Sequence, residues 1–254
     1  MIFDSHSHYD DEAFDSDREE VLSSLINKNV DKIISVASSW NSIEKVIQIC
    51  ETHSFAYPAL GIHPENALDL TKEREALLKS LIIEKKAVAI GEIGLDYHYD
   101  EPPKDIQKEV FIKQLELAKE LDLPVIIHSR DAALDTLELV RAHLPQKRGV
   151  VHCFSSSFET AVEYINMGFY IGIGGVVTFK NGKKLKDIAA RIPLSSILIE
   201  TDCPYMAPTP FRGERNDSSL LSYVAEEIAS LRGISSKEVI DATSNNAIKL
   251  FNIN

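Results

Sequence analysis

Three residues near the start of the chain, Asp4, His6 and His8, occupy alternate positions in the segment MIFDSHSHYD. Successive side chains of a β-strand point to opposite faces, so these three are expected to share one face, together with Ile2. Two imidazoles on one face of a strand can bind the same metal ion. The same pattern also fits a polar segment exposed to water, and the remainder of the chain has to decide between the two interpretations.

Short apolar runs rich in valine and isoleucine alternate with amphipathic segments along the whole chain. The apolar runs predict buried strands within residues 2–6, 31–38, 56–64, 87–96, 123–130, 149–155, 169–175 and 196–202. The amphipathic segments predict helices within residues 17–29, 42–53, 73–86, 106–121, 132–144, 158–168, 183–192, 219–233 and 235–251. Strands that alternate with helices indicate a parallel sheet.

Eight strands in this arrangement favour a (β/α)8 TIM barrel that forms one domain over residues 1–254. The competing architecture is an open doubly wound sheet. That fold usually carries a glycine-rich loop after its first strand, whereas this chain has HSHYDDEAF there.

The bulk composition excludes some classes of function. The chain has 27 lysines and arginines against 39 aspartates and glutamates, which gives a net charge of −12. Such a chain is not built to coat nucleic acid by bulk electrostatic attraction. The three cysteines are widely spaced and indicate neither a disulfide framework nor a cysteine zinc site. We therefore expect a cytoplasmic protein without a signal peptide, membrane span or obligate protein partner.

Most of the predicted strands end in residue types that bind metals. These residues are His6, His8, His63, Glu92, His128, His152, Glu200 and Asp202. All strands of a parallel barrel end at one rim, so these side chains are expected to converge there. Taken singly, each is more often a hydrogen-bonded structural residue. Taken together they would be costly to bury without partners, and bound cations would remove that cost.

The number of ligand residues is sufficient for two divalent ions that share a bridging carboxylate. We expect His6, His8 and Asp202 to hold one ion. His128 and His152 would hold the other, with Glu92 bridging the two. The mixed nitrogen and oxygen ligands suit Zn, Mn, Fe or Co better than Mg, and the choice among Mg, Mn and Zn stays open.

Six segments of the chain resemble the TatD family of metal-dependent deoxyribonucleases, which belongs to the amidohydrolase-like barrels. They are DSHSH, GIHPENA, AIGEIGLDYH, PVIIHSRDA, VVHCFSSS and ETDCPYMAPTPFRGERN, and they span nearly the whole chain. The resemblance implies a TIM barrel, a two-metal site and cleavage of phosphodiester bonds. It also implies a bridging glutamate, where many other amidohydrolases use a carboxylated lysine, and Glu92 matches that feature. Ser156 and Cys203 depart from the residues common in the family, but neither is an expected ligand.

The ligand set leads to a mechanistic hypothesis in which Asp202 is both a ligand and the base that accepts a proton from the attacking water. His63 is not needed as a ligand. It would orient the scissile phosphate or protonate the leaving group, and a structural role is an equal alternative. Glu200 and Asp4 are expected to orient ligand residues.

The predicted rim also carries residues suited to a nucleic-acid strand. The expected phosphate contacts are Arg130, Lys180, Arg212 and Arg215, and Tyr97 and Tyr205 are expected to stack on bases. Because the cations are so few, we expect the protein to bind only the end of a single-stranded DNA and to cleave it from that end, as an exonuclease does.

Two alternatives remain open from the sequence. One is an amidohydrolase-type enzyme that cleaves a small-molecule amide, lactone or ester, or the ester of an aminoacyl-tRNA. The other is a metal-binding scaffold without catalysis, which the complete ligand set disfavours.

Overall fold

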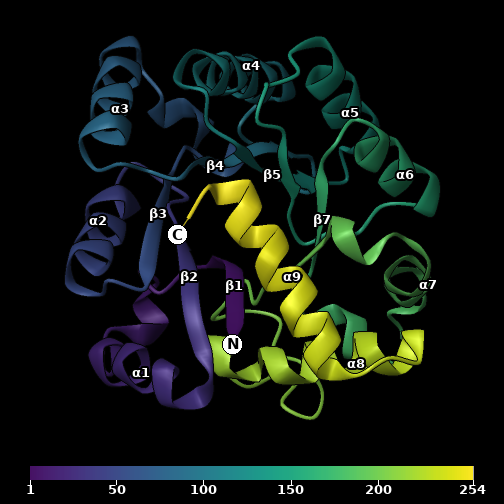
Figure 1. The fold of residues 1–254 in the computed structure, drawn as a ribbon. Helices are drawn as coiled ribbons and strands as arrows, with labels where there is room; N and C mark the ends of the chain where they lie inside the picture. Colours follow the sequence, from purple (N-terminus) through teal and green to yellow (C-terminus); the bar gives the residue numbers. More distant parts are fainter. Residues whose placement is uncertain (254) are drawn as a thin grey trace.

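The computed structural model describes residues 1–253 and shows parallel strands enclosed by helices (Figure 1). Each predicted apolar run overlaps one strand, and neighbouring strands pair in chain order. The strands are β1 (Ile2–Ser7), β2 (Val30–Val36), β3 (Ala56–Leu60), β4 (Ala89–Asp96), β5 (Val125–Arg130), β6 (Gly149–Val151), β7 (Tyr170–Ile173) and β8 (Ile197–Ile199). The segment after β8 returns to β1 through a parallel bridge between Cys203 and Ser7. The predicted TIM barrel is thereby confirmed.

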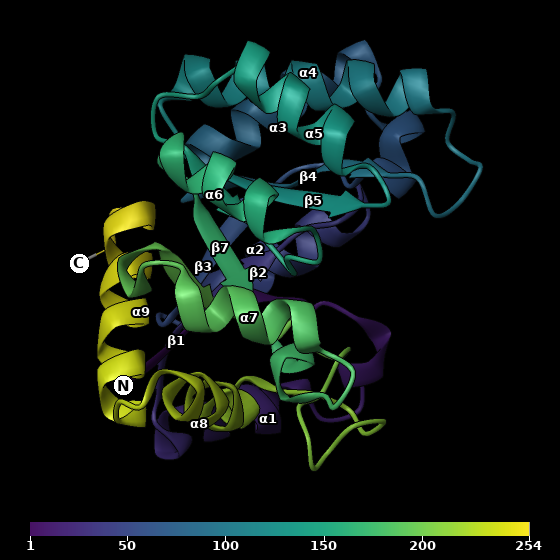
Figure 2. The ribbon, with the colours of Figure 1, turned by 90° about the vertical axis from the view of Figure 1, so that its right-hand side faces the viewer.

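The helices follow the strands and surround the barrel (Figure 2). They are α1 (Arg18–Leu25), α2 (Ser42–Thr52), α3 (Lys72–Glu84), α4 (Lys104–Leu121), α5 (Ala133–Ala142), α6 (Phe158–Asn166), α7 (Lys183–Arg191), α8 (Leu221–Arg232) and α9 (Ser236–Phe251). Within residues 1–253, no helix is both long enough and apolar enough to cross a membrane. Residue 254, the last of the predicted domain, lies outside the described residues.

One end of the barrel is closed by apolar side chains. The interior cluster consists of Phe3, Ile34, Val36, Ala59, Ala89, Ile126, Val150 and Leu198, joined by side chains of α9. The Phe3 and Phe251 rings lie 6.1 Å apart between centroids. In Figure 1 this helix, drawn in yellow, crosses the barrel opening near the start of β1. The polar residues are therefore left to the opposite end, where the strands terminate.

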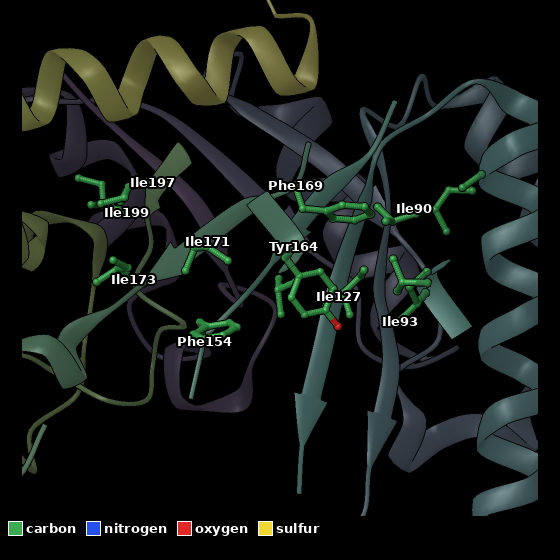
Figure 3. Close-up of a cluster of buried hydrophobic side chains, with 14 of the residues drawn as sticks. Ile90, Ile93, Ile127, Phe154, Tyr164, Phe169, Ile171, Ile173, Ile197 and Ile199 are labelled. Carbon is green, nitrogen blue, oxygen red and sulfur yellow. The ribbon is translucent and has the colours of Figure 1, made fainter. Parts of the chain in front are cut away.

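Alternation along the strands separates this interior from an outer apolar layer. Ile171 and Ile173 of β7 and Ile197 and Ile199 of β8 pack in the outer layer, shown in Figure 3. Each such side chain, once fully buried, contributes about 1.5–3 kcal/mol to the stability of the fold. The alternate positions on each strand point into the barrel. Some of them carry the apolar interior cluster, and those nearer the strand ends carry the polar site.

The first strand departs from strict alternation. Ile2 packs in the outer cluster and Phe3 in the interior, and the pairing of β1 with β2 is irregular between Asp4 and Ser7. The prediction that Ile2 shares one face with the two histidines was therefore wrong. The irregular pairing shifts the face on which the later side chains of β1 lie.

Gly94 allows β4 to approach β5 closely. Its φ is +148°, and a Cβ atom there would lie 2.0 Å from the carbonyl oxygen of His128. Only glycine tolerates this combination of backbone angle and space. The close approach places both Glu92 and Asp96 beside the imidazole of His128.

Candidate metal centre

The polar residues at the strand ends converge at the end of the barrel opposite α9. Among them, Asp4 of β1 holds the backbone of β1 and of the segment after β8 in place. Its carboxylate accepts hydrogen bonds from the backbone amides of His6 and Thr201, at 3.2 Å and 3.0 Å. It also accepts from the hydroxyls of Thr201 and Ser218, both at 2.6 Å. Asp4 therefore holds the backbone next to two expected ligands, His6 and Asp202, rather than an imidazole ring.

Glu92 occupies the middle of the centre, and its two carboxylate oxygens face different histidines. Oε1 lies 2.7 Å from His152 Nε2 and 2.8 Å from His128 Nδ1. Oε2 lies 3.4 Å from His6 Nε2 and 3.5 Å from His8 Nε2. The side chain is buried at 3% exposure. A carboxylate shared in this way has the arrangement needed to bridge two cations.

The first group of donor atoms belongs to His6, His8, Glu92 and Asp202. The two Nε2 atoms of His6 and His8 lie 2.9 Å apart, and Asp202 Oδ1 lies 3.7 Å and 3.5 Å from them. His8 Nδ1–H donates to the carbonyl oxygen of Val36 at 2.9 Å, which leaves the neutral ring a lone pair on Nε2. This lone pair points at the other donor atoms of the group.

The spacing of these atoms fits a tetrahedral ion. Four ligand atoms about 2.1 Å from a shared ion lie roughly 3.4 Å from one another. The separations between donor atoms in the first group run from 2.9 Å to 3.7 Å. The second group consists of His128, His152 and Glu92, and its two imidazole nitrogens, His128 Nδ1 and His152 Nε2, lie 3.4 Å apart. The donor atoms of the first group and the two imidazoles of the second are therefore spaced much as ligands of a divalent ion would be.

Within residues 1–253, the triads of side chains that could hold a metal ion all come from this centre. They are His6–His152–Asp202, His6–His8–Glu92 and His63–Glu92–His128. All six expected ligands lie within this one constellation.

The charge state of the centre also favours cations. Burial raises the pKa of Glu92, but the facing His152, His63 and His6 outweigh it and hold the pKa well below the ordinary value. Burial likewise raises the pKa of Asp202, and the bond with His8 and nearby imidazoles lower it overall. Both carboxylates are thus anionic at neutral pH, and divalent ions would replace protons on the imidazoles that face them.

His63 lies beside the centre in a neutral form. Its Nδ1 accepts the backbone amide of Glu65 at 3.2 Å, so the ring proton sits on Nε2, 3.7 Å from Glu92 Oε1. Burial lowers the pKa of His63 to about 3. A neutral ring can donate a hydrogen bond to a phosphate oxygen. The low pKa does not support the alternative in which His63 protonates the leaving group.

Glu200 lies beside His152, a member of the second group of donor atoms. Its Oε1 accepts the backbone amide of Cys153 and lies 3.5 Å from His152 Nδ1. The carboxylate is fully buried, and a Cβ atom at Gly172 would fall within 2.5 Å of it. This placement puts the Glu200 carboxylate where it can orient the ring of His152.

Asp96 is a residue of the centre that the sequence reasoning missed. Its Oδ2 lies 3.0 Å from His128 Nε2, on the side of the ring opposite Glu92. Gln107 holds it in place by accepting the Asp96 backbone amide at 2.9 Å. Burial raises the pKa of Asp96, but the bond with His128 lowers it overall, so Asp96 is anionic. A carboxylate that accepts the Nε2 proton keeps Nδ1 free to bind a cation.

We expect Asp96→Asn to weaken the binding of one metal ion by about 10-fold to 100-fold, because loss of an outer carboxylate costs this much at comparable sites. Titration of the metal-free protein with Co²⁺, followed by absorption, measures the affinity and reports the ligand environment. The control is Asp135→Asn, which removes a carboxylate that pairs with Lys108 nearby. Equal Co²⁺ affinities for the two variants would contradict the role of Asp96.

The centre opens into a cavity of about 1010 Å³. Of the expected substrate contacts, Arg130 and Tyr205 line it. Four others are not among its lining residues: Tyr97, Lys180, Arg212 and Arg215. Lys183, Lys184 and Tyr99 line it instead, and the sequence reasoning did not single them out.

Three of these expected contacts are engaged elsewhere. Tyr97 donates a hydrogen bond to Asp135 at 2.7 Å. Arg215 donates two hydrogen bonds to Asp17, at 2.5 Å and 2.8 Å. Arg212 lies over the ring of Phe179 at 4.4 Å. The structure therefore places the basic side of the cavity at α7 rather than at the loop that follows β8.

A TIM barrel with histidines and carboxylates gathered at its strand ends defines a metal-dependent hydrolase of the amidohydrolase-like fold. The family model described as "TatD related DNase" matches residues 3–252, and the chain belongs to this family.

Relatives match the chain over its full length. An uncharacterized metal-dependent hydrolase of Bacillus subtilis, YabD, is 46% identical over 255 residues, and the match covers 100% of this chain and 100% of YabD. The human deoxyribonuclease TATDN3 is 35% identical, over 98% of this chain and 94% of that protein. The crystal structure of YjjV, a TatD homolog from Escherichia coli K12, superimposes with a TM-score of 0.94 at 34% identity. It covers 100% of this chain and 98% of YjjV.

Proposed function

We propose that this metal-dependent hydrolase cleaves phosphodiester bonds of DNA, from the end of a single strand, with two divalent ions in the centre. The observation that carries the proposal is the carboxylate of Glu92, whose two oxygens face two separate groups of imidazoles. His6, His8 and Asp202 would hold one ion, His128 and His152 the other, and Glu92 both. Mg, Mn and Zn are the candidate ions.

Divalent ions in such a site supply the Lewis acidity that makes water a nucleophile near neutral pH and offsets charge on a phosphoryl group. The residues of the chain perform the remaining tasks. Asp202 is anionic and at the edge of the cavity, where it can accept the proton of the attacking water. The neutral ring of His63 can donate its Nε2 proton to an oxygen of the scissile phosphate as a hydrogen bond.

Two features support a DNA strand as the substrate. The cavity is large enough for more than one nucleotide, and its wall includes three basic residues, Arg130, Lys183 and Lys184. The human relative TATDN3 is named a deoxyribonuclease. A chain with a net charge of −12 offers few other cationic positions for a polyanion.

One observation favours a second candidate, an aminoacyl ester. The same cavity also carries the carboxylates of Asp10, Asp11 and Glu65. These groups would repel a phosphate but would attract the ammonium group of an aminoacyl-tRNA ester. These acidic residues follow β1 and β3, whereas Lys183 and Lys184 begin α7, so the two candidates would use different parts of one cavity.

The test uses protein stripped of metal and then reloaded separately with Mg, Mn or Zn. Each form is incubated with end-labelled single-stranded DNA and, in parallel, with an aminoacyl-tRNA. We expect metal-dependent, stepwise shortening of the DNA. Release of the amino acid with intact DNA would overturn the proposal in favour of the second candidate.

A further inference from the structure

The basic residues that line the cavity differ from most others in the chain by having no ion-pair partner. Many lysines and arginines of the outer helices pair with a nearby acid, for example Lys79 with Glu120 and Lys186 with Glu227. Among the described residues, no carboxylate lies within ion-pair distance of Lys183, Lys184 or Arg130. Unpaired cations in the wall of a cavity are available to an anionic ligand.

The cavity is polarised across the barrel. Because the strands pair in chain order, β5 to β7 lie across the barrel from β1 to β3. The acidic wall follows β1 and β3, through Asp10, Asp11 and Glu65. The unpaired cations lie at the end of β5, with Arg130, and at the start of α7, with Lys183 and Lys184. An anionic ligand is therefore directed toward the sector between β5 and α7.

The same sector also supplies apolar surface. Val176 after β7 is partly exposed and lines the cavity beside the two lysines, whereas Leu185 and Ile188 of α7 are buried at 6% and 1% exposure. Charge and apolar surface therefore adjoin between Val176 and the first residues of α7. A nucleotide combines the same two features, an anionic phosphate and a base with apolar faces.

We propose that the sector between β5 and α7 is a subsite for the nucleotide next to the scissile phosphodiester. Lys183 and Lys184 pair with the phosphate of this nucleotide, and Val176 contacts its base. This inference rests on the proposed function, since it names how the same cavity holds its substrate. The subsite has no sequence preference, because apolar side chains offer a base no directional hydrogen bonds.

The experiment compares two substrates with metal-loaded enzyme. Bis(4-nitrophenyl) phosphate contains a single phosphodiester, whereas trithymidylate offers a neighbouring phosphate for the subsite. In the double variant Lys183→Ala/Lys184→Ala, we expect kcat/KM for trithymidylate to fall at least tenfold more than kcat/KM for the small ester. The loss should appear mainly in KM. The slope of log KM against log salt should fall by about 0.7, the value for one single-strand phosphate.

The matched control is Lys28→Ala/Lys72→Ala, which removes the same charge from exposed positions away from the cavity. The variant Lys183→Arg/Lys184→Arg keeps the charge and should recover most of the activity on trithymidylate. Equal losses on both substrates, or equal losses in the control and the test variant, would overturn the subsite.

Binding distinguishes failure of the subsite from failure of the proposed function. A fluorescein-labelled trithymidylate with phosphorothioate linkages hydrolyses slowly, and its anisotropy reports affinity for the metal-loaded protein. If the wild type binds it and Lys183→Ala/Lys184→Ala binds at least tenfold more weakly, the subsite stands even where no phosphodiester is cleaved. If both bind alike, the subsite is wrong even where DNA is cleaved.

Discussion

Replacing Glu92 with alanine is expected to lower metal-dependent hydrolysis by about 10³-fold or more, a loss typical when charge stabilisation at a reacting centre is removed. The two oxygens of Glu92 face both groups of imidazoles, at 2.7 Å and 3.4 Å for the nearest nitrogen of each. Alanine leaves the two groups without a shared anionic ligand. We therefore also expect fewer than two tightly bound ions per chain.

Two measurements check this expectation, hydrolysis at saturating metal and metal content by plasma mass spectrometry. The control Glu20→Ala removes an exposed carboxylate of α1, outside the cavity. Circular dichroism shows whether the Glu92→Ala protein is folded. A folded variant with two ions and wild-type hydrolysis would contradict the bridging role.

Replacing Asp202 with asparagine is the second change with a large expected effect, a fall in kcat of about 10²-fold to 10⁴-fold. The amide has nearly the same size as the carboxylate, but it cannot accept a proton. Burial raises the pKa of Asp202, yet its bond with His8 and the neighbouring imidazoles lower the pKa overall. The wild-type carboxylate is therefore ready to act as a base at neutral pH.

The check is kcat as a function of pH for both proteins. Since the pKa of Asp202 in the folded protein is below its ordinary value, its charge is lost only in strong acid. Protonation of Asp202 should thus not limit wild-type kcat at mildly acidic pH, and Asp202→Asn should be low throughout. The control Asp31→Asn alters a carboxylate that pairs with Lys32 at the start of β2. A kcat for Asp202→Asn within tenfold of wild type would exclude the role as base.

The barrel could be predicted from the sequence because each strand is a short apolar run bounded by an amphipathic helix. The same pattern indicated the site, since several polar residues at the ends of buried strands are together costly to bury without partners. Inward positions on a strand recur every second residue, which is why Ile126 and His128 share the barrel interior. The alternation failed in β1 and between Ile90 and Ile93 of β4, where the irregular pairing was not visible in the sequence.

Asp96 was missed although the sequence contained its signal. It lies four residues after Glu92 on one strand, and residues two or four apart share a face. The predicted strand over residues 87–96 already included Asp96, and its alternation from Glu92 onward places both carboxylates in the centre. The two lysines of α7 carried a weaker signal, since exposed lysines at helix starts are common.

The roles of Tyr97 and Arg215 could not be predicted, because each depends on a partner far along the chain. Asp17, which binds Arg215, lies 198 residues away in sequence, and Asp135, which binds Tyr97, lies 38 away. Such pairs are fixed by how loops pack after the barrel closes. The composition of a loop shows that it carries cations and aromatic rings, but not which of them face the cavity.

The central claim is that Glu92 bridges two ions, and anomalous diffraction from crystals of Mn²⁺-loaded protein tests it most directly. We expect two anomalous peaks per chain on either side of the Glu92 carboxylate. One should lie against His6, His8 and Asp202, and the other against His128 and His152. A single peak, or two peaks of which neither contacts Glu92, would contradict the account.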